Sequence, residues 1–527
     1  MAIARWTPPT EPTRQEKALL KRCKKTRKLY AFLREQRLAI FDDERQDWLE
    51  SMYRETGAGK EPVCPALMAM ALILQGYFKV SDAEAVELTV VDLRWQMVLG
   101  CLGARTPAFS QGALFDFRER LIAHDMDIKL LEHTAAAART SKGFDARKLP
   151  KNLRLAIDSC PLDGAGRVED TVNLIGHAMR NVVKCVATLL DWEFERVCKE
   201  TGTTVLMATS IKRALDRDWS DAREKAEAVD VLAKQVLSLE RWLEDHLSDE
   251  AQEPPLDRLL STLHEVMDQD LEPDPDPKGG LRIARGVAED RRISIEDGQM
   301  RHGRKTKSKR IDGYKRHVAT DLDSQAIVAC AITPANVPEH EAFPELKAEI
   351  ERQGLRFKEA HFDRGYMGSP AVAELEADGV EILCKPWKAH NGKFFSKDEF
   401  RTDLRSKTIT CPAGQTKNFE FGRTVEFDCM ACRACALRDR CTPADFDHGR
   451  TVSIAKNERL QKRLRGMSKT KKGRQRFRDR VLVEHSLAHI VQRQGQRARF
   501  MGVRKNLFDM RRAAIIQNLE TAQRKAA

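Results

Sequence analysis

A short apolar strand that runs into a carboxylate occurs twice in this chain, and this feature constrains the fold more than any other. The first strand, "NLRLAIDS" (152–159), alternates leucine and isoleucine with other residues and then reaches Asp158. The second lies in "KEAHFDRGYMGS" (358–369), where a strand pattern reaches Asp363 and a helical pattern follows at once. Alternation of this kind predicts strands with a buried face. If the two strands are neighbours in one sheet, we expect both carboxylates to emerge at the same edge.

The order of the other elements predicts the kind of sheet. A helical pattern over about 170–265 follows the first strand, and "GYKRHVATDLDSQAIVACAIT" (313–333) predicts a β-hairpin. Helices and strands then alternate as far as "VEILCKP" (380–386). This order is that of an RNase H-like core, an α/β fold whose mixed sheet has an antiparallel hairpin and parallel neighbours. We expect a helical insert at 176–290 after the first strand, and a cysteine-rich, basic insert at 387–473 before the last helix.

Residues 1–145 have mostly helical apolar spacing, as in "PALMAMALILQGYFKV" and "SQGALFDFRERLIAHD". We therefore expect a helical DNA-binding domain at 1–145, followed by a catalytic domain at 146–527. A plain helical bundle is the alternative for the first part. The longest apolar run, "PALMAMALIL" (65–74), is too short to span a membrane. The first residues lack the apolar core of a signal peptide, so we expect a cytoplasmic protein.

A third carboxylate is predicted on the last helix, "RFRDRVLVEHSLAHIVQRQG" (476–495). Helical spacing places Glu484 in the middle of a stripe that we expect to pack on the sheet. The apolar members of that stripe are Phe477, Val481, Ala488 and Val491. An unpaired carboxylate there would be costly, whereas a metal ion would compensate it. Arg480, one turn earlier, could pair with Glu484 or contact a DNA phosphate.

Phosphodiester chemistry on two metal ions needs several carboxylates from distant parts of a chain. Mg²⁺ prefers hard oxygen ligands, and two ions clamp the attacking and the leaving oxygen. Asp158, Asp363 and Glu484 match that requirement as an ordered set, with Mg²⁺ or Mn²⁺ as the metal. Each residue alone has a simpler explanation, namely a turn, a helix cap or an ion pair between adjacent helical turns.

Five of the thirteen cysteines cluster between residues 411 and 441. They are Cys411, Cys429, Cys432, Cys435 and Cys441. Pairs of thiols two residues apart suit tetrahedral Zn²⁺, and we predict a structural zinc site here. The alternatives are an iron–sulfur cluster, whose usual final spacing is missing, and reduced thiols without a metal.

The formal net charge is +12, and the excess is uneven. Residues 456–480 contain twelve Lys and Arg against two acids, and residues 301–316 contain eight against one. A third basic run, "KALLKRCKKTRK", occupies 17–28. One such block is typical of a solvated surface, but three together favour binding to the phosphates of a nucleic acid.

The motifs together resemble a known family, the bacterial insertion-sequence transposases of the DDE superfamily. The resemblance is to the branch with a helical N-terminal domain and a cysteine-bearing C-terminal half, and it extends from about residue 40 to 520. The matching stretches are "PALMAMALILQGYFKVSDAEAVELTVVDLRWQMVLG", "LRLAIDSCPLDGAGRVEDTVNLI", "KSKRIDGYKRHVATD", "ITPANVPEHEAF", "HFDRGY", "TCPAGQT" and "RDRVLVEHSLAHIVQRQGQRARFMG".

The resemblance implies roles for individual residues. Asp158, Asp363 and Glu484 would be the metal-binding triad, and Arg480 would be the arginine of a Tyr-Arg-Glu-Lys signature. In this chain Phe477 occupies the tyrosine position and Val491 the lysine position. The zinc ligands implied by the resemblance are Cys411, Cys432, Cys435 and Cys441, with Cys429 as a possible member.

The implied function is a DNA transposase that cuts at the ends of an insertion sequence and joins the free 3′-hydroxyl to target DNA. Its partners would be double-stranded DNA and a second copy of the chain, without a membrane, in the cytoplasm and associated with the nucleoid. Two rivals stay open: a metal-dependent DNA nuclease of the same fold, and a non-catalytic or domesticated DNA-binding relative.

Overall fold

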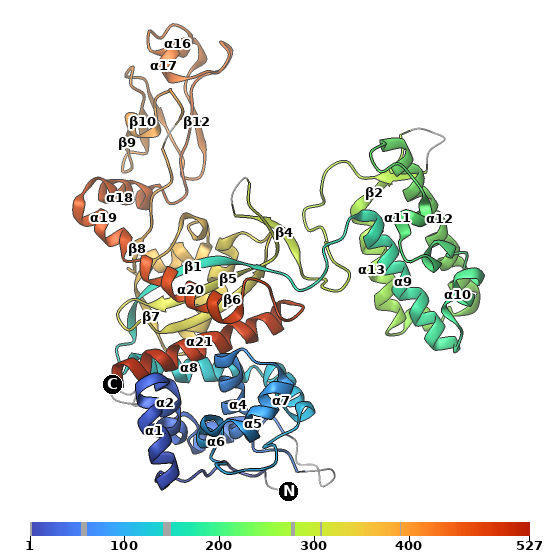
Figure 1. The fold of residues 1–527 in the computed structure, drawn as a ribbon. Helices are drawn as coiled ribbons and strands as arrows, with labels where there is room; N and C mark the ends of the chain where they lie inside the picture. Colours follow the sequence, from blue (N-terminus) through green and yellow to red (C-terminus); the bar gives the residue numbers. More distant parts are fainter. Residues whose placement is uncertain are drawn as a thin grey trace.

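The protein is built around a six-stranded mixed sheet (Figure 1). The structure, a computed structural model, describes residues 3–53, 61–140, 149–275, 280–305, 308–389 and 391–526. The main path of the sheet is β4 (Arg301–Arg304), β5 (Arg310–Asp321), β1 (Asn152–Asp163), β7 (Arg356–His361) and β8 (Glu381–Leu383). Strand β6 (Ile327–Pro334) pairs with β5 beside β4.

The pairing confirms an α/β fold with a mixed sheet. Strands β5 and β6 form the predicted antiparallel hairpin, and β1 is antiparallel to β5. On its other side, β1 runs parallel to β7, and β7 runs parallel to β8. Strand β1, which contains Asp158, and strand β7, which ends just before Asp363, are therefore neighbours, as expected.

The two faces of the sheet are packed differently because successive side chains of a strand point to opposite sides. Leu155 and Ile157 of β1 lie in a core with α14 (Phe343–Arg352) and α15 (Pro370–Ala377). Ala156 faces the other way, into a core shared with the N-terminal helices.

The N-terminal helices pack against the sheet through α21 (Val503–Ala526), as Figure 1 shows. They are α1 (Arg14–Thr26), α2 (Lys28–Ile40), α3 (Asp43–Glu50), α4 (Pro65–Phe78), α5 (Asp82–Val91), α6 (Leu93–Leu99), α7 (Gln111–Ala123) and α8 (Met126–Arg139). The sequence did not predict α21, whose buried Arg511 pairs with Asp127 and Glu349. The expected domain boundary at 145–146 lies outside the described residues.

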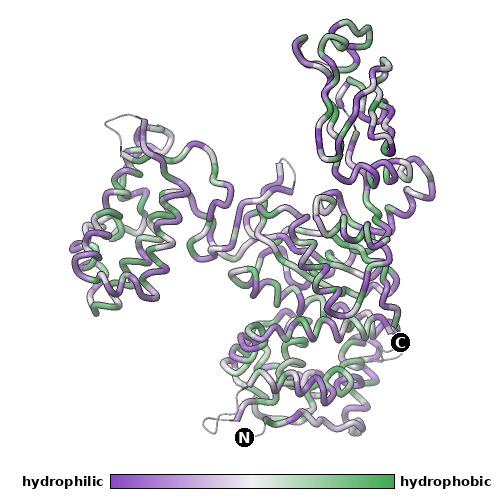
Figure 2. The backbone as a smooth tube through the Cα atoms, turned by 180° about the vertical axis from the view of Figure 1, so that it is seen from behind, coloured by the Kyte–Doolittle hydropathy of each residue, from purple (hydrophilic) through white to green (hydrophobic). Residues whose placement is uncertain are grey.

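The segment after β1 forms a helical body beside the sheet, with its own hydrophobic core (Figure 1). Its main elements are α9 (Thr171–Leu190), α10 (Phe194–Glu200), α11 (Ile211–Leu215), α12 (Ala222–His246), α13 (Leu256–Asp270), β2 (Leu271–Pro273) and β3 (Leu281–Ile283). Hydrophobic and hydrophilic segments alternate along its helices (Figure 2), which is typical of helices that bury one face.

The cysteine-rich segment extends away from the sheet at the opposite end from the N-terminal helices (Figure 1). Its elements are β9 (Arg401–Asp403), β10 (Thr408–Thr410), β11 (Thr416–Asn418), β12 (Thr424–Glu426), α16 (Cys429–Arg433), α17 (Arg438–Cys441) and β13 (Thr451–Ser453). It has a small core of its own, which includes Ile409 and Phe427. Helices α18 (Glu458–Lys469) and α19 (Lys471–Arg478) lead back to the sheet.

The predicted last helix differs from the structure in two respects. It is broken, because α19 ends at Arg478 and α20 (Val481–Gln494) begins after Arg480. The predicted buried stripe is confirmed only for Phe477, which packs against the core around α14 and α15, whereas Val481 is 44% exposed and Glu484 and Ala488 are exposed as well. The face of α20 that packs on the sheet instead consists of Val483, Ser486, Leu487 and Ile490. Within the described residues, no helix is long and apolar enough to cross a membrane.

Candidate active site

The pairing register between β1 and β7 places the two aspartates at equivalent positions beyond the last residue pair. The last pair between β1 and β7 is Ala156 with His361. Asp158 and Asp363 each lie two residues further along, where β7 has already ended. Asp158 does not close its strand as predicted, because β1 continues to Asp163 against β5. At Asp158, strand β1 is therefore paired with β5 on one side and is no longer paired with β7 on the other.

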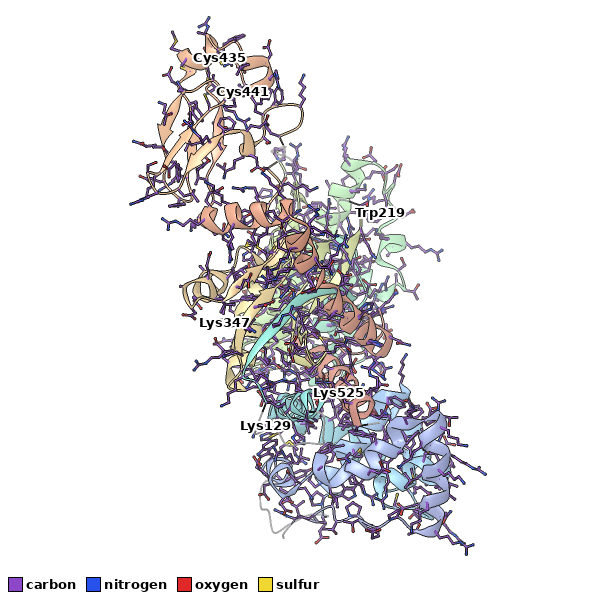
Figure 3. All side chains as sticks on the ribbon, turned by 90° about the vertical axis from the view of Figure 1, so that its left-hand side faces the viewer. Lys129, Trp219, Lys347, Cys435, Cys441 and Lys525 are labelled. Atoms are coloured by element: carbon purple, nitrogen blue, oxygen red, sulfur yellow. The ribbon has the colours of Figure 1, made fainter. Side chains whose placement is uncertain are left out.

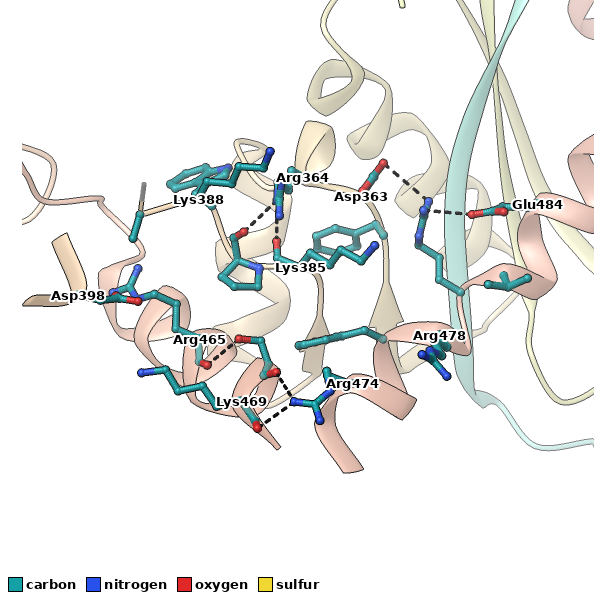
Figure 4. Close-up of a pocket in the computed structure, with 18 residues that line it drawn as sticks. Asp363, Arg364, Lys385, Lys388, Asp398, Arg465, Lys469, Arg474, Arg478 and Glu484 are labelled. Carbon is teal, nitrogen blue, oxygen red and sulfur yellow. Dashed lines mark hydrogen bonds and ion pairs between the residues drawn. The ribbon is translucent and has the colours of Figure 1, made fainter. Parts of the chain in front are cut away.

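One guanidinium connects all three predicted carboxylates. Arg480 Nη1 lies 2.7 Å from Asp158 Oδ2 and 3.9 Å from Asp363 Oδ2. Its Nη2 lies 3.2 Å from Glu484 Oε1. Figure 4 shows Asp363 and Glu484 reaching this guanidinium from opposite sides. Four residues from three distant parts of the sequence thus converge on one point of the structure.

The electrostatics of this point differ among the three acids. The pKa of Asp158 is raised to about 6, mainly by burial and with smaller upward contributions from the charges of Asp363 and Glu484. Arg480 and the Ser159 N–H oppose that shift. The Asp158 side chain is 15% exposed, whereas the side chains of Asp363 and Glu484 are each 51% exposed. The site therefore has one largely covered acid, Asp158, with two more exposed acids around it.

Ion pairs below the site hold α20 in place. Asp479, at the break before α20, accepts a hydrogen bond from Arg154 of β1 at 2.8 Å. Arg154 also contacts Glu359 of β7 at 3.0 Å. On the preceding turn, Arg476 pairs with Glu359 and with Glu381 of β8. These contacts fix the start of α20, and Glu484 lies in its first turn, where the helix dipole favours a negative charge.

Two cavities meet at the carboxylates, and each is lined by one of the predicted basic blocks. A cavity of about 740 Å³ contains all three acids, together with Arg304 and Lys305 of the block 301–316. The other, of about 570 Å³, shares Asp363 and Glu484 (Figure 4). Its basic lining residues are Arg364, Lys385, Lys388, Arg465, Lys469, Arg474, Arg478 and Arg480. Lys and Arg side chains therefore line the cavities on two sides of the three acids.

The two positions that differ from the Tyr-Arg-Glu-Lys signature also lie at these cavities. Phe477 lines the smaller cavity and Val491 the larger one. Sequence reasoning missed three contributors: Arg154, Glu339 and Lys315. Glu339 and Lys315 line the larger cavity. Glu339 stands in the stretch "ITPANVPEHEAF", a few residues after β6 ends, but that position alone did not assign it a role.

Four cysteines line a separate cavity of about 310 Å³ in the cysteine-rich segment, which we call the extension. Figure 3 shows two of them, Cys435 and Cys441, near the end of the extension that is remote from the sheet. The four are Cys411, Cys432, Cys435 and Cys441, and Cys429 does not line this cavity. The Gln415 N–H donates to Cys411 Sγ at 3.3 Å, and the Leu437 N–H donates to Cys435 Sγ at 3.4 Å. Across the described residues, however, no three His, Cys, Asp or Glu side chains are grouped closely enough to hold a metal ion.

Comparison with known proteins gives two matches to protein families. Residues 410–522 match a family described as "Transposase DDE domain". This range includes Arg480, Glu484 and the four cysteines of the extension, but neither aspartate. Residues 19–120, in the N-terminal helices, match a family described as "Transposase domain (DUF772)". No curated protein and no solved structure matches the chain. Both family matches agree with the site and indicate an insertion-sequence transposase of the DDE type.

Proposed function

We propose that this transposase cuts DNA at the ends of its insertion sequence with divalent metal ions held by Asp158, Asp363 and Glu484. The observation that carries the proposal is the convergence of these three acids on one guanidinium, that of Arg480. A set of acidic oxygens around one positive charge suits Mg²⁺ or Mn²⁺, which prefer hard oxygen ligands. We further propose that the sheet is an RNase H-like core, which the strand order and the position of the helical insert support.

Bound metal ions would supply Lewis acidity, which lowers the pKa of an attacking water and stabilises the leaving oxygen. The residues of the chain hold and orient the reacting groups. Asp158 is held from two sides, by Arg480 and by the Ser159 N–H at 2.9 Å. Arg480 offsets the repulsion among the acids, and its proposed second role is to contact a DNA phosphate.

The proposed reaction has two phosphoryl-transfer steps at one site. In the first, water adds to the phosphorus at the end of the element and the 3′ oxygen leaves as a hydroxyl. In the second, this 3′-hydroxyl attacks a phosphodiester of the target DNA and displaces its 3′ oxygen. Both steps need the same acids and a DNA backbone held beside them. The basic linings of the two cavities support that placement.

The N-terminal helices are proposed as the DNA-binding domain at 1–145, with the catalytic domain at 146–527. The basic helix α1 supports this role, since six of its thirteen residues are Lys or Arg. A homodimer is proposed because two element ends must be paired, and association with the nucleoid would follow from DNA binding. Light scattering of the protein, with and without DNA of the element ends, tests the dimer.

We also propose a structural Zn²⁺ site at Cys411, Cys432, Cys435 and Cys441. The shared cavity and the two N–H···S hydrogen bonds support it. Zn²⁺ would link loops whose own core is small. Metal analysis of the purified protein should give about one Zn²⁺ per chain, and protein without zinc would refute this part of the proposal.

Cleavage of a plasmid that carries the flanking DNA of the gene tests the main proposal. Wild-type protein with Mg²⁺ or Mn²⁺ should cut at the ends of the element, and Asp363→Ala should bind the same DNA without cutting it. Cutting by Asp363→Ala would refute the role of the acids. Binding without cutting by both proteins would favour a non-catalytic relative, with Phe477 and Val491 as the first positions to examine. Cutting without joining would favour a nuclease.

A further inference from the structure

Glu339 lies at the active-site cavity but has no role in the proposal so far. It begins a short 3-10 helix, η3 (Glu339–Ala342), shortly after β6. Its side chain is half-buried and lines the cavity of about 740 Å³ that also contains Asp158, Asp363 and Glu484. A fourth carboxylate at this cavity needs a physical reason, because it adds negative charge where three acids already repel one another.

The first contact of Glu339 leads to the Asp158 segment. The Ser159 hydroxyl donates a short hydrogen bond to Glu339 Oε1. The Ser159 N–H in turn donates to Asp158 Oδ1 at 2.9 Å. Ser159 therefore connects the two carboxylates, with its hydroxyl on one and its amide on the other. A hydrogen bond to a charged acceptor is stronger than one between neutral groups, so this link is a firm one.

The second contact leads to the Asp363 segment. Gly365 lies two residues after Asp363 in η4 (Arg364–Tyr366), and a Cβ at this position would overlap the carboxylate of Glu339. The backbone of Gly365 does not have a positive φ, so glycine is not required by its conformation. A Cβ at Gly365 would therefore displace the Glu339 carboxylate from its present position.

Buried side chains pack next to these contacts and hydrogen-bond one another. Tyr366 follows Gly365, is fully buried, and hydrogen-bonds His317 Nδ1 at 2.7 Å. His317 Nε2 lies 3.0 Å from the Thr333 hydroxyl. Burial raises the pKa of Tyr366 well above its ordinary value, and the charges of Glu339 and Asp158 raise it further. Glu339 thus hydrogen-bonds the Asp158 segment through Ser159 and packs closely against Gly365 of the Asp363 segment.

We propose that Glu339 is a positioning residue, whose carboxylate ties the Asp158 segment to the Asp363 segment and so sets the separation of the two metal-binding aspartates. The inference rests on the proposed function, because the separation matters only if the aspartates share divalent ions. Residues that orient metal ligands typically change metal affinity by about 10- to 100-fold when they are removed.

Mn²⁺ binding to the full-length protein without DNA, followed by electron paramagnetic resonance, tests the proposal without depending on cleavage. Glu339→Ala should bind Mn²⁺ about 10- to 100-fold more weakly than wild type. Glu339→Gln should retain most of the affinity, since its amide oxygen still accepts the Ser159 hydrogen bond. Glu341→Ala, an exposed acid on the same short helix, is the matched control and should bind like wild type.

The outcomes separate the possible roles. A loss in Glu339→Gln as large as in Glu339→Ala would overturn the positioning role, because it would mean that the charge itself binds the metal. Unchanged affinity in Glu339→Ala would overturn the inference alone. Wild-type protein that binds no Mn²⁺, or binds it equally well after Asp158→Asn, would overturn the proposed function and the inference together.

A double-mutant cycle gives a second test that tolerates small losses of stability. Gly365→Ala should weaken Mn²⁺ binding, because its Cβ displaces the Glu339 carboxylate. Adding Gly365→Ala to Glu339→Ala should cost little more than Glu339→Ala alone, since the overlap is then gone. Fully additive losses would contradict the proposed contact. Melting temperatures of all variants in EDTA show whether each one is folded.

Discussion

Glu359 is predicted to stabilise the sheet beneath the active site in a pH-dependent manner. It lies on β7 and contacts Arg154 at 3.0 Å, Arg476 at 3.1 Å and His361 at 2.9 Å. Burial alone would raise the pKa of this carboxyl, but the hydrogen bonds from His361 and Arg154 outweigh it and lower the pKa to about 2. The Glu359→Gln substitution keeps the shape of the side chain and removes its charge.

The size of the effect follows from the shift in pKa. A difference of about 2.5 units between the unfolded and the folded chain corresponds to about 3 kcal/mol at neutral pH. The Glu359 side chain is 12% exposed, and screening by the solvent at this edge reduces the expected loss to about 2 kcal/mol. This loss applies to the free energy of local opening of the part of the sheet formed by β1, β7 and β8.

The sign of the pH dependence is fixed by the direction of the shift. Because the folded pKa is depressed, the contribution is complete well above the unfolded pKa, near 4.5, and is lost as the pH falls toward 2. Hydrogen exchange of peptides that cover 356–361 measures this opening locally, which avoids treating a multi-part protein as two-state. Between pH 7 and pH 3, the difference between wild type and Glu359→Gln should fall by about half.

An exposed ion pair provides the control. Glu374 pairs with Lys347 at 3.3 Å, but its side chain is 61% exposed, so Glu374→Gln should change the opening free energy by less than about 0.5 kcal/mol. The reasoning fails if Glu359→Gln is as stable as this control at pH 7. It also fails if the difference from wild type does not shrink as the pH is lowered.

Three further predictions test other parts of the structure. Ile490→Ala, on the buried face of α20, should lower the free energy of local opening of α20 by about 2–4 kcal/mol in hydrogen exchange, whereas Val481→Ala should lower it by less than about 0.5 kcal/mol; equal effects would contradict the observed helix face. Cys432→Ser should reduce the bound zinc to near zero and speed proteolysis of the extension but not of the N-terminal helices. Lys388→Ala should reduce the salt dependence of DNA binding by about one unit of the log–log slope, and an unchanged slope would exclude a phosphate contact.

The strands were predictable from sequence because their signal is local. A period of two residues is visible in the strand that contains Asp158 and in the hairpin of β5 and β6, and both were found. The side of α20 that packs was not predictable by the same means. Val481 and Glu484 have helical spacing, and so do Val483 and Leu487, so the helix offers two overlapping stripes. Only the sheet beneath the helix selects between them.

Helix α21 is a second element whose packing could not be predicted from local sequence patterns. Its buried arginines would be read as a solvated surface, since charged residues are rarely buried without partners. The partners of Arg511 are Asp127 and Glu349, which come from segments more than 160 residues away. No window along the sequence contains such a pair, and the burial of this helix follows only from the assembled fold.

Local periodicity was sufficient to predict the α/β class, and the resemblance of the motifs to known transposases predicted the family and the residue types of the site. The assembly of the site, in contrast, depends on contacts between distant segments. The register of β1 and β7 aligns Asp158 with Asp363, and Arg480 reaches both aspartates and Glu484. Glu339 comes between the two aspartate segments for the same reason: contacts between distant segments depend on packing, which no local pattern encodes.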